Sequence, residues 1–99
     1  MTDIILIKYN LSGGKEIVLF DRLGMKNLHK RVEIARNICL LDEQGEIVWQ
    51  VSSDFDSEGN PFTNMTLHRD GSITAYRWDG GNYTINTETG FATPSMLMK

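Results

Sequence analysis

Three acidic residues stand at alternate positions in the segment SDFDSEGNPF. They are Asp54, Asp56 and Glu58, and Gly59 follows them, which is the order of ligands and glycine in the first half of an EF-hand calcium loop. That loop ends in a bidentate glutamate at its twelfth position, where this chain has Met65. A calcium site here would lack its closing ligand, so we expect no metal.

The same carboxylates are poorly suited to catalysis. Glycoside hydrolysis needs two carboxyl groups that face each other across a cleft, roughly 5–10 Å apart. Three acids on one short loop are instead expected to be solvated. Cys39 lies between apolar residues as a small buried hydrophobe, and His29 and His68 have no neighbour that marks an acid–base pair. An enzyme that uses His68 and a nearby acid is an alternative, but we predict no catalytic residue and no cofactor.

The negative charge is concentrated in one part of the sequence. Residues 1–41 carry seven Lys and Arg against four Asp and Glu, and residues 61–99 carry three of each. Residues 42–60 carry six acids and no base. Because Lys and Arg supply most of the affinity for nucleic acid, this acidic chain is a poor nucleic-acid binder and a better partner for a basic protein.

Length and composition predict a single domain over residues 1–99. The longest aliphatic runs have four residues, whereas a membrane-spanning helix needs about 20. The N-terminus has no basic lead-in, so we expect no secretory signal and a cytoplasmic protein.

Turn signals divide the chain into short stretches. NLSGG, DEQG, RDGS, WDGGN and TETG separate segments rich in β-branched and aromatic residues, such as IVWQV and SITAYRW. This pattern predicts an all-β fold, an antiparallel meander of six to eight strands that forms a small sandwich or half-open barrel. The helical candidate is 21–32, where Gly24 predicts a helix of one or two turns or, alternatively, a loop.

Alternation within the predicted strands assigns side chains to faces. In SITAYRW, Ile73, Ala75 and Arg77 fall on one side, and Tyr76 and Trp78 fall on the other. ICLL has no alternation and predicts a central strand that is covered on both faces. The residues predicted to share one face of IVWQV are Ile47, Trp49 and Val51.

Four aromatic residues come from neighbouring predicted strands: Trp49, Tyr76, Trp78 and Tyr83. They form either the core of a small domain or a platform for a carbohydrate or another small ligand. The sequence leaves both alternatives open.

The segments IVWQV, PFTN and AYRWDGGNYTINTETG carry a family resemblance. With them, residues 40–90 resemble small bacterial immunity proteins of contact-dependent growth inhibition and related polymorphic toxin systems. The resemblance implies a cytoplasmic protein without enzymatic activity that binds one toxin domain tightly and blocks its active site. Such toxins are often nucleases, and an acidic loop complements the basic cleft of a nuclease.

We therefore predict a partner-binding surface on the acidic segment. Asp54, Asp56 and Glu58 would provide the electrostatic contacts with the basic toxin domain. Phe55 or Phe62 would provide the apolar anchor.

A second patch is predicted at Trp78 and Asp79, where the chain turns. Two alternatives to the immunity hypothesis are that DFDSEGN is only a solvated connection between strands, and that the protein is a carbohydrate- or ligand-binding module. We expect no direct nucleic-acid partner and no membrane, and the sequence leaves the oligomeric state open.

Overall fold

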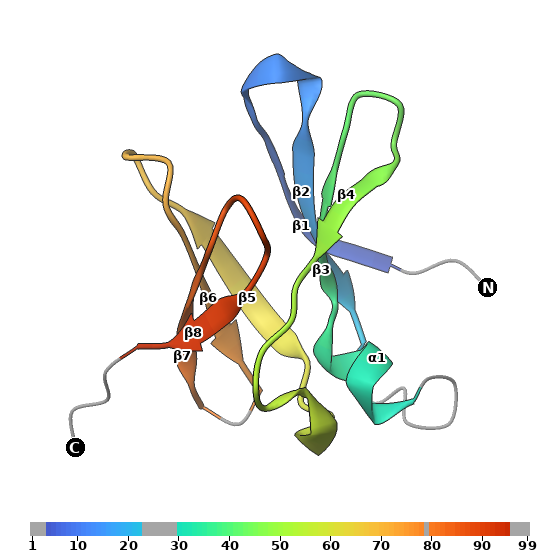
Figure 1. The fold of residues 1–99 in the computed structure, drawn as a ribbon, viewed down its shortest axis with the longest axis vertical. Helices are drawn as coiled ribbons and strands as arrows, with labels where there is room; N and C mark the ends of the chain where they lie inside the picture. Colours follow the sequence, from blue (N-terminus) through green and yellow to red (C-terminus); the bar gives the residue numbers. More distant parts are fainter. Residues whose placement is uncertain (1–3, 23–29, 79, 96–99) are drawn as a thin grey trace.

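The computed structural model describes residues 4–22, 30–78 and 80–95, which form two four-stranded antiparallel sheets (Figure 1). The strand order is β1-β2-β3-β4 in the first sheet and β5-β6-β7-β8 in the second, so strands that are neighbours in sequence also pair. The predicted all-β antiparallel meander is confirmed. Because the two sheets are separate, the architecture is a small sandwich and not a closed barrel.

The first sheet carries the central strand that the sequence predicts. Its strands are β1 (Ile4–Asn10), β2 (Glu16–Asp21), β3 (Ile38–Leu41) and β4 (Ile47–Gln50). Strand β3 lies between β2 and β4, and its first three residues are buried. Cys39 is one of them, as predicted.

The second sheet is built from hairpins at the predicted turns. Its strands are β5 (Phe62–Leu67), β6 (Ile73–Arg77), β7 (Asn82–Ile85) and β8 (Ala92–Pro94). In the TETG turn, Gly90 has a φ of 81°, and a Cβ at this position would lie 2.5 Å from the Trp49 ring. Both the backbone conformation and this close approach therefore require glycine.

A β-bulge in β4 changes which side chains of this strand are buried. Ile47 and Trp49 pair with consecutive residues of β3, so Val48 between them is an extra residue. Trp49 is buried, but Ile47 is 61% exposed. The prediction that Ile47 shares a face with Trp49 is therefore wrong, because the bulge breaks the alternation on which it depended.

One hydrophobic core lies between the two sheets. Strand β2 contributes Ile17 and Leu19, and the second sheet contributes Met65, Ile73 and Ile85, all of them buried. Removal of this apolar surface from water is the main force that holds the sheets together.

The buried Asn37 adds polar contacts between the sheets. Its Nδ2 donates to the carbonyl oxygens of Phe20 at 2.6 Å and Phe62 at 2.8 Å. Its Oδ1 accepts from the backbone amide of Phe62 at 2.9 Å. Because Phe20 lies in β2 and Phe62 begins β5, one side chain connects the two sheets.

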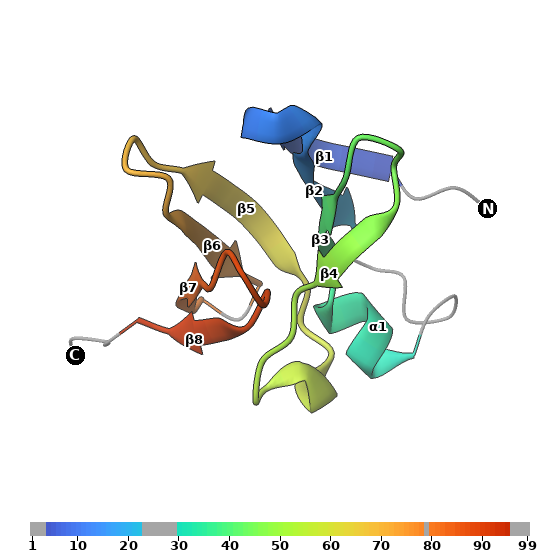
Figure 2. The same cartoon turned by 45° about the horizontal axis from the view of Figure 1, so that its top comes forward.

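The residues that the structure describes contain one α-helix, α1 (Arg31–Ala35). It begins near the end of the predicted helical segment 21–32, of which residues 23–29 lie outside the described part of the chain. Figure 2 shows α1 beside the 3-10 turn η2 (Asp56–Glu58), at the end of the molecule where the chain passes from the first sheet to the second.

Candidate functional site

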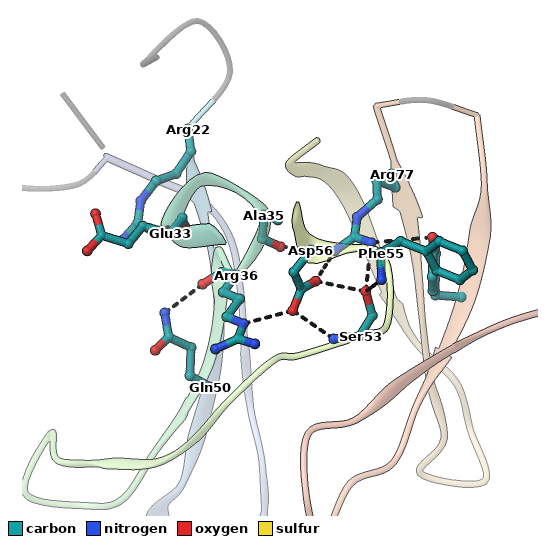
Figure 3. A network of polar contacts seen from close by, with 10 residues as sticks. Arg22, Glu33, Ala35, Arg36, Gln50, Ser53, Phe55, Asp56 and Arg77 are labelled. Atoms are coloured by element: carbon teal, nitrogen blue, oxygen red, sulfur yellow. Dashed lines mark hydrogen bonds and ion pairs between the residues drawn. The ribbon is translucent and has the colours of Figure 1, made fainter. Parts of the chain in front are cut away.

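The acidic loop, residues 54–58, folds around the carboxylate of Asp56, which is 3% exposed. Its Oδ2 accepts a hydrogen bond from the backbone amide of Ser53 at 2.9 Å, and its Oδ1 accepts one from the Ser53 hydroxyl at 2.7 Å. These bonds turn the carboxylate into the protein (Figure 3).

Two arginines from different elements pair with the same carboxylate, and Figure 3 shows Asp56 between them. Arg36, which follows α1, donates from Nε to Oδ2 at 2.7 Å. Arg77, at the end of β6, donates from Nη2 to Oδ1 at 3.1 Å. Charge-assisted hydrogen bonds of this kind are strong, so the acidic loop is fixed both to α1 and to the second sheet.

Arg77 is fully buried, and protein contacts replace most of its hydration. Its Nη1 donates to the Ser53 hydroxyl at 2.9 Å, and its Nη2 also donates to the carbonyl oxygen of Ala35 at 3.1 Å. The guanidinium carbon lies 4.1 Å from the ring centroid of Phe62 and 4.8 Å from that of Tyr83. For its Nε, the described residues provide no hydrogen-bond partner. Such a buried cation requires the counter-charge of Asp56.

The network keeps Asp56 ionised. Burial of the carboxyl raises its pKa and is the largest single effect, but hydrogen bonds from Arg36, Ser53 and Arg77 together hold the pKa below its usual value. The expectation that all three acids of the loop are solvated is therefore wrong for Asp56. Since its charge is balanced inside the protein, Asp56 does not belong to a partner-binding surface.

The neighbours of Asp56 face solvent. Asp54 and Glu58 are exposed, and Phe55 is 41% exposed. Phe55 and Glu58 also line an open groove of about 350 Å³, whose other walls come from the turn between β6 and β7 and from Tyr83 and Pro94. The acidic loop thus combines two carboxylates with an aromatic side chain beside a groove.

The remaining predicted site residues are placed differently. Phe62 is 1% exposed, and its ring packs edge-on against Tyr83 with centroids 5.3 Å apart. It belongs to the core, so the prediction of Phe62 as an anchor is wrong. Trp78 is 58% exposed just after β6, and its backbone amide donates to the carbonyl oxygen of Pro61 at 2.9 Å. Asp79 lies outside the described residues.

The acids of residues 42–60 do not form one surface. Asp42, Glu43 and Glu46 lie in the turn between β3 and β4, and Figure 1 shows this turn at the opposite end of the molecule from η2. The predicted acidic segment is therefore continuous in sequence but divided in space.

The predicted aromatic cluster is divided between core and surface. Trp49 and Tyr83 are buried, and Nε1 of Trp49 donates to the carbonyl oxygen of Thr87 at 3.0 Å. Tyr76 and Trp78 are exposed, on the side of β6 that the alternation predicted. A platform of all four aromatic residues does not form: Tyr76 and Trp78 are exposed, and Tyr83 is reached only from the groove beside Phe55.

His68 follows β5, in the exposed hairpin that leads to β6. Its Nε2 lies 2.8 Å from Oγ1 of Thr74, and Asp70 accepts hydrogen bonds from the amide and hydroxyl of Ser72 at 2.9 and 2.6 Å. These contacts organise the turn. In the described parts of the chain, no group of three or more His, Cys, Asp or Glu is placed to hold a metal ion.

Sequence reasoning missed the residues that hold the acidic loop in place: Arg36, Ser53 and Arg77. For Arg77 a signal was present, because it shares an alternating row with the apolar Ile73 and Ala75. A charged residue in such a row needs a buried counter-charge. No local pattern pointed to Arg36 or Ser53.

The fold and the loop define a small two-sheet β protein with a fixed, exposed acidic loop. The chain belongs to the family described as a domain of unknown function (DUF7957), which matches residues 14–95, from just before β2 to just after β8. No curated protein and no solved structure matches the chain. None of the helices in the described part is long and apolar enough to cross a membrane.

Proposed function

We propose that this protein is a non-catalytic immunity or inhibitor protein whose acidic loop binds the basic active-site cleft of a toxin domain, most simply a nuclease. The observation that carries the proposal is the loop itself. It presents an exposed aromatic residue, Phe55, between the exposed carboxylates of Asp54 and Glu58, and a buried ion pair holds it in place.

The anchoring of the loop supports a binding role. A loop that is fixed before binding loses little conformational entropy when the partner docks, so more of the contact energy appears as affinity. Asp56 holds the loop from two sides, through Arg36 and Arg77. Phe55 suits the role of anchor because a few aromatic side chains often provide most of the binding energy at an interface.

The loop offers two carboxylates to a partner. Asp54 and Glu58 are exposed, whereas the charge of Asp56 is balanced by arginines. Opposite charges across an interface raise the association rate and disfavour wrong partners. A nuclease cleft has the complementary positive potential because it binds phosphate. The toxin class itself comes from the resemblance of residues 40–90 to immunity proteins.

The proposal is tested by co-purification of the tagged protein with the product of the reading frame immediately upstream. We expect a stable stoichiometric complex with a basic, toxic domain. Phe55→Ala should remove most of the complex, whereas Phe91→Ala, at a similarly exposed phenylalanine outside the loop, should retain it. Absence of a complex, or equal binding by the two variants, would contradict the proposal.

A further inference from the structure

The outer face of the second sheet carries an ordered row of hydroxyl groups. Cross-strand pairing places one threonine from each strand in a single row, formed by Thr66, Thr74, Thr84 and Thr93. With strands about 4.8 Å apart, the row is roughly 14 Å long.

A second row lies beside the threonines. Asn64 pairs with Tyr76, and Tyr76 pairs with Asn82; all three residues are exposed. A shallow depression of about 80 Å³ is lined by this row together with Thr66 and Thr74. We call the two rows together the threonine–asparagine face.

Neither row contains a charged side chain, and the charges that border the threonine row, Arg69 and Asp70 in the hairpin between β5 and β6, are of opposite sign; they line an open depression with Thr74 and Thr84. This composition disfavours partners that are recognised by charge. Phosphate contacts need Lys or Arg, and a charged protein surface needs the opposite charge. The face instead complements a neutral ligand that carries many hydroxyl groups.

We infer that the threonine–asparagine face binds a neutral oligosaccharide. The exposed rings of Tyr76 and of Trp78, two residues further on, offer apolar surfaces against which the CH side of a sugar ring packs. The side-chain NH2 groups of Asn64 and Asn82 can donate to neighbouring sugar hydroxyls, while Oδ1 of Asn64 already accepts from the backbone amide of Met65 at 2.9 Å. Thr74 is held by His68, so the hydroxyls of Thr66, Thr84 and Thr93 extend these contacts along the row. A row of this length suits several sugar units.

This inference is independent of the proposed function. It concerns the outer face of strands β5 to β8, whereas the acidic loop belongs to the connection between β4 and β5. The two surfaces adjoin at Asn82, which lines both the shallow depression and the groove beside Phe55. Variants for the test therefore avoid Asn82.

The test is an NMR titration of the isotope-labelled protein with cellohexaose, maltohexaose, laminarihexaose and chitohexaose. We expect at least one of these sugars to cause saturable shifts in the amide signals of the threonine–asparagine face. Tyr76→Ala should weaken that binding about tenfold through loss of an aromatic contact. Thr84→Lys, which puts a charge into the threonine row, should also weaken it, and Glu46→Gln in the turn between β3 and β4 should leave it unchanged.

Several results would overturn the inference. They are the absence of saturable shifts with all four sugars at millimolar concentration, shifts confined to another surface, or unchanged binding by Tyr76→Ala and Thr84→Lys. The amide spectrum of each variant shows whether it is folded, and Thr84→Lys keeps the test valid if Tyr76→Ala does not fold. Loss of toxin-domain binding in these variants, without any sugar affinity, would identify the face as a protein interface instead.

Discussion

Asp56 takes its role from residues that are distant in sequence. Arg36 and Arg77 lie 20 and 21 positions away, and their charges make it possible for the carboxylate to be buried. A buried ion pair adds little stability relative to apolar residues of the same shape. Removal of one partner, however, leaves a buried charge without compensation, and the predictions at the scale of single residues follow from this asymmetry.

Asp56→Asn nearly keeps the shape of the side chain but removes its charge, so Arg77 stays buried without its counter-charge. We expect the free energy of unfolding at neutral pH, measured by urea denaturation, to fall by about 3–5 kcal/mol. Asp54→Asn, the same change at an exposed position, should alter it by less than about 0.5 kcal/mol. Equal effects would show that Asp56 is not an anchor.

The lowered pKa of Asp56 predicts a loss of stability in acid. An aspartate in the unfolded chain titrates at about pH 4, and the pKa of Asp56 in the folded protein lies below that. Above the unfolded pKa both states are ionised and the stabilisation is complete. As the pH falls, the unfolded state binds the proton first, and the stabilisation is lost as the pH passes through the folded pKa.

The difference in unfolding free energy between the wild type and Asp56→Asn should therefore shrink as the pH falls below about 4. Denaturation series at several pH values measure it, and the other titrating groups cancel because both proteins contain them. A difference that stays constant down to about pH 2 would contradict the lowered pKa.

Arg77→Met replaces the buried cation by an apolar side chain and leaves Asp56 with Arg36 alone. This substitution should cost about 3 kcal/mol. The double variant Asp56→Asn/Arg77→Met should lose less than the sum of the single losses, by about 0.5–3 kcal/mol, because both substitutions remove the same ion pair. Strictly additive losses would show that the two side chains act independently.

At the scale of an element, the acidic loop, which includes η2, is one fixed unit. Gly59 ends η2 with a φ of 75°, and a Cβ there would lie 3.1 Å from the side chain of Arg31. The glycine and the Asp56 anchor together set the direction in which Asp54 and Glu58 point. The loop can therefore be changed at its exposed acids while its conformation is preserved.

Asp54→Lys with Glu58→Lys should slow association with the basic toxin domain by at least about tenfold and weaken its salt dependence, because steering depends on the sign of the exposed charge. Stopped-flow measurements over a salt series provide the readout. Glu43→Lys with Glu46→Lys, which changes two exposed acids in the turn between β3 and β4, is the control with the same change in net charge and should associate nearly as the wild type does. Equal slowing by Glu43→Lys with Glu46→Lys would mean that net charge, and not the loop, guides the encounter.

At the scale of the whole molecule, the two sheets are joined by their common core and by Asn37. Asn37→Ala leaves buried backbone groups of Phe20 and Phe62 without their partner, so it should cost about 2–3 kcal/mol. Asn10→Ala, at an exposed position of β1, should cost less than about 0.5 kcal/mol.

Amide signals from both sheets should disappear in one transition during denaturation of the wild type, because the sheets share a core. Separate transitions for the two sheets would show that the contacts through Asn37 and the core do not couple them.

Local patterns were sufficient for the fold class, the turns and the two faces of β6. Turn residues such as those of TETG prescribe backbone conformation over a few positions, and side chains alternate along a strand whatever lies beyond it. The exposure of Asp54, Phe55 and Glu58 likewise agrees with a polar connection between strands.

Contacts between residues distant in sequence determined the features that local patterns did not predict. The bulge that exposes Ile47 depends on pairing between β3 and β4, and the burial of Asp56 depends on arginines from two other elements. Phe62 is buried because its ring packs against the ring of Tyr83 and the guanidinium of Arg77, which come from β7 and β6. The separation of the acids into two groups follows from the path of β4 across the molecule. These features could not be predicted because each depends on which distant residues the fold brings together, and no local pattern contains that information.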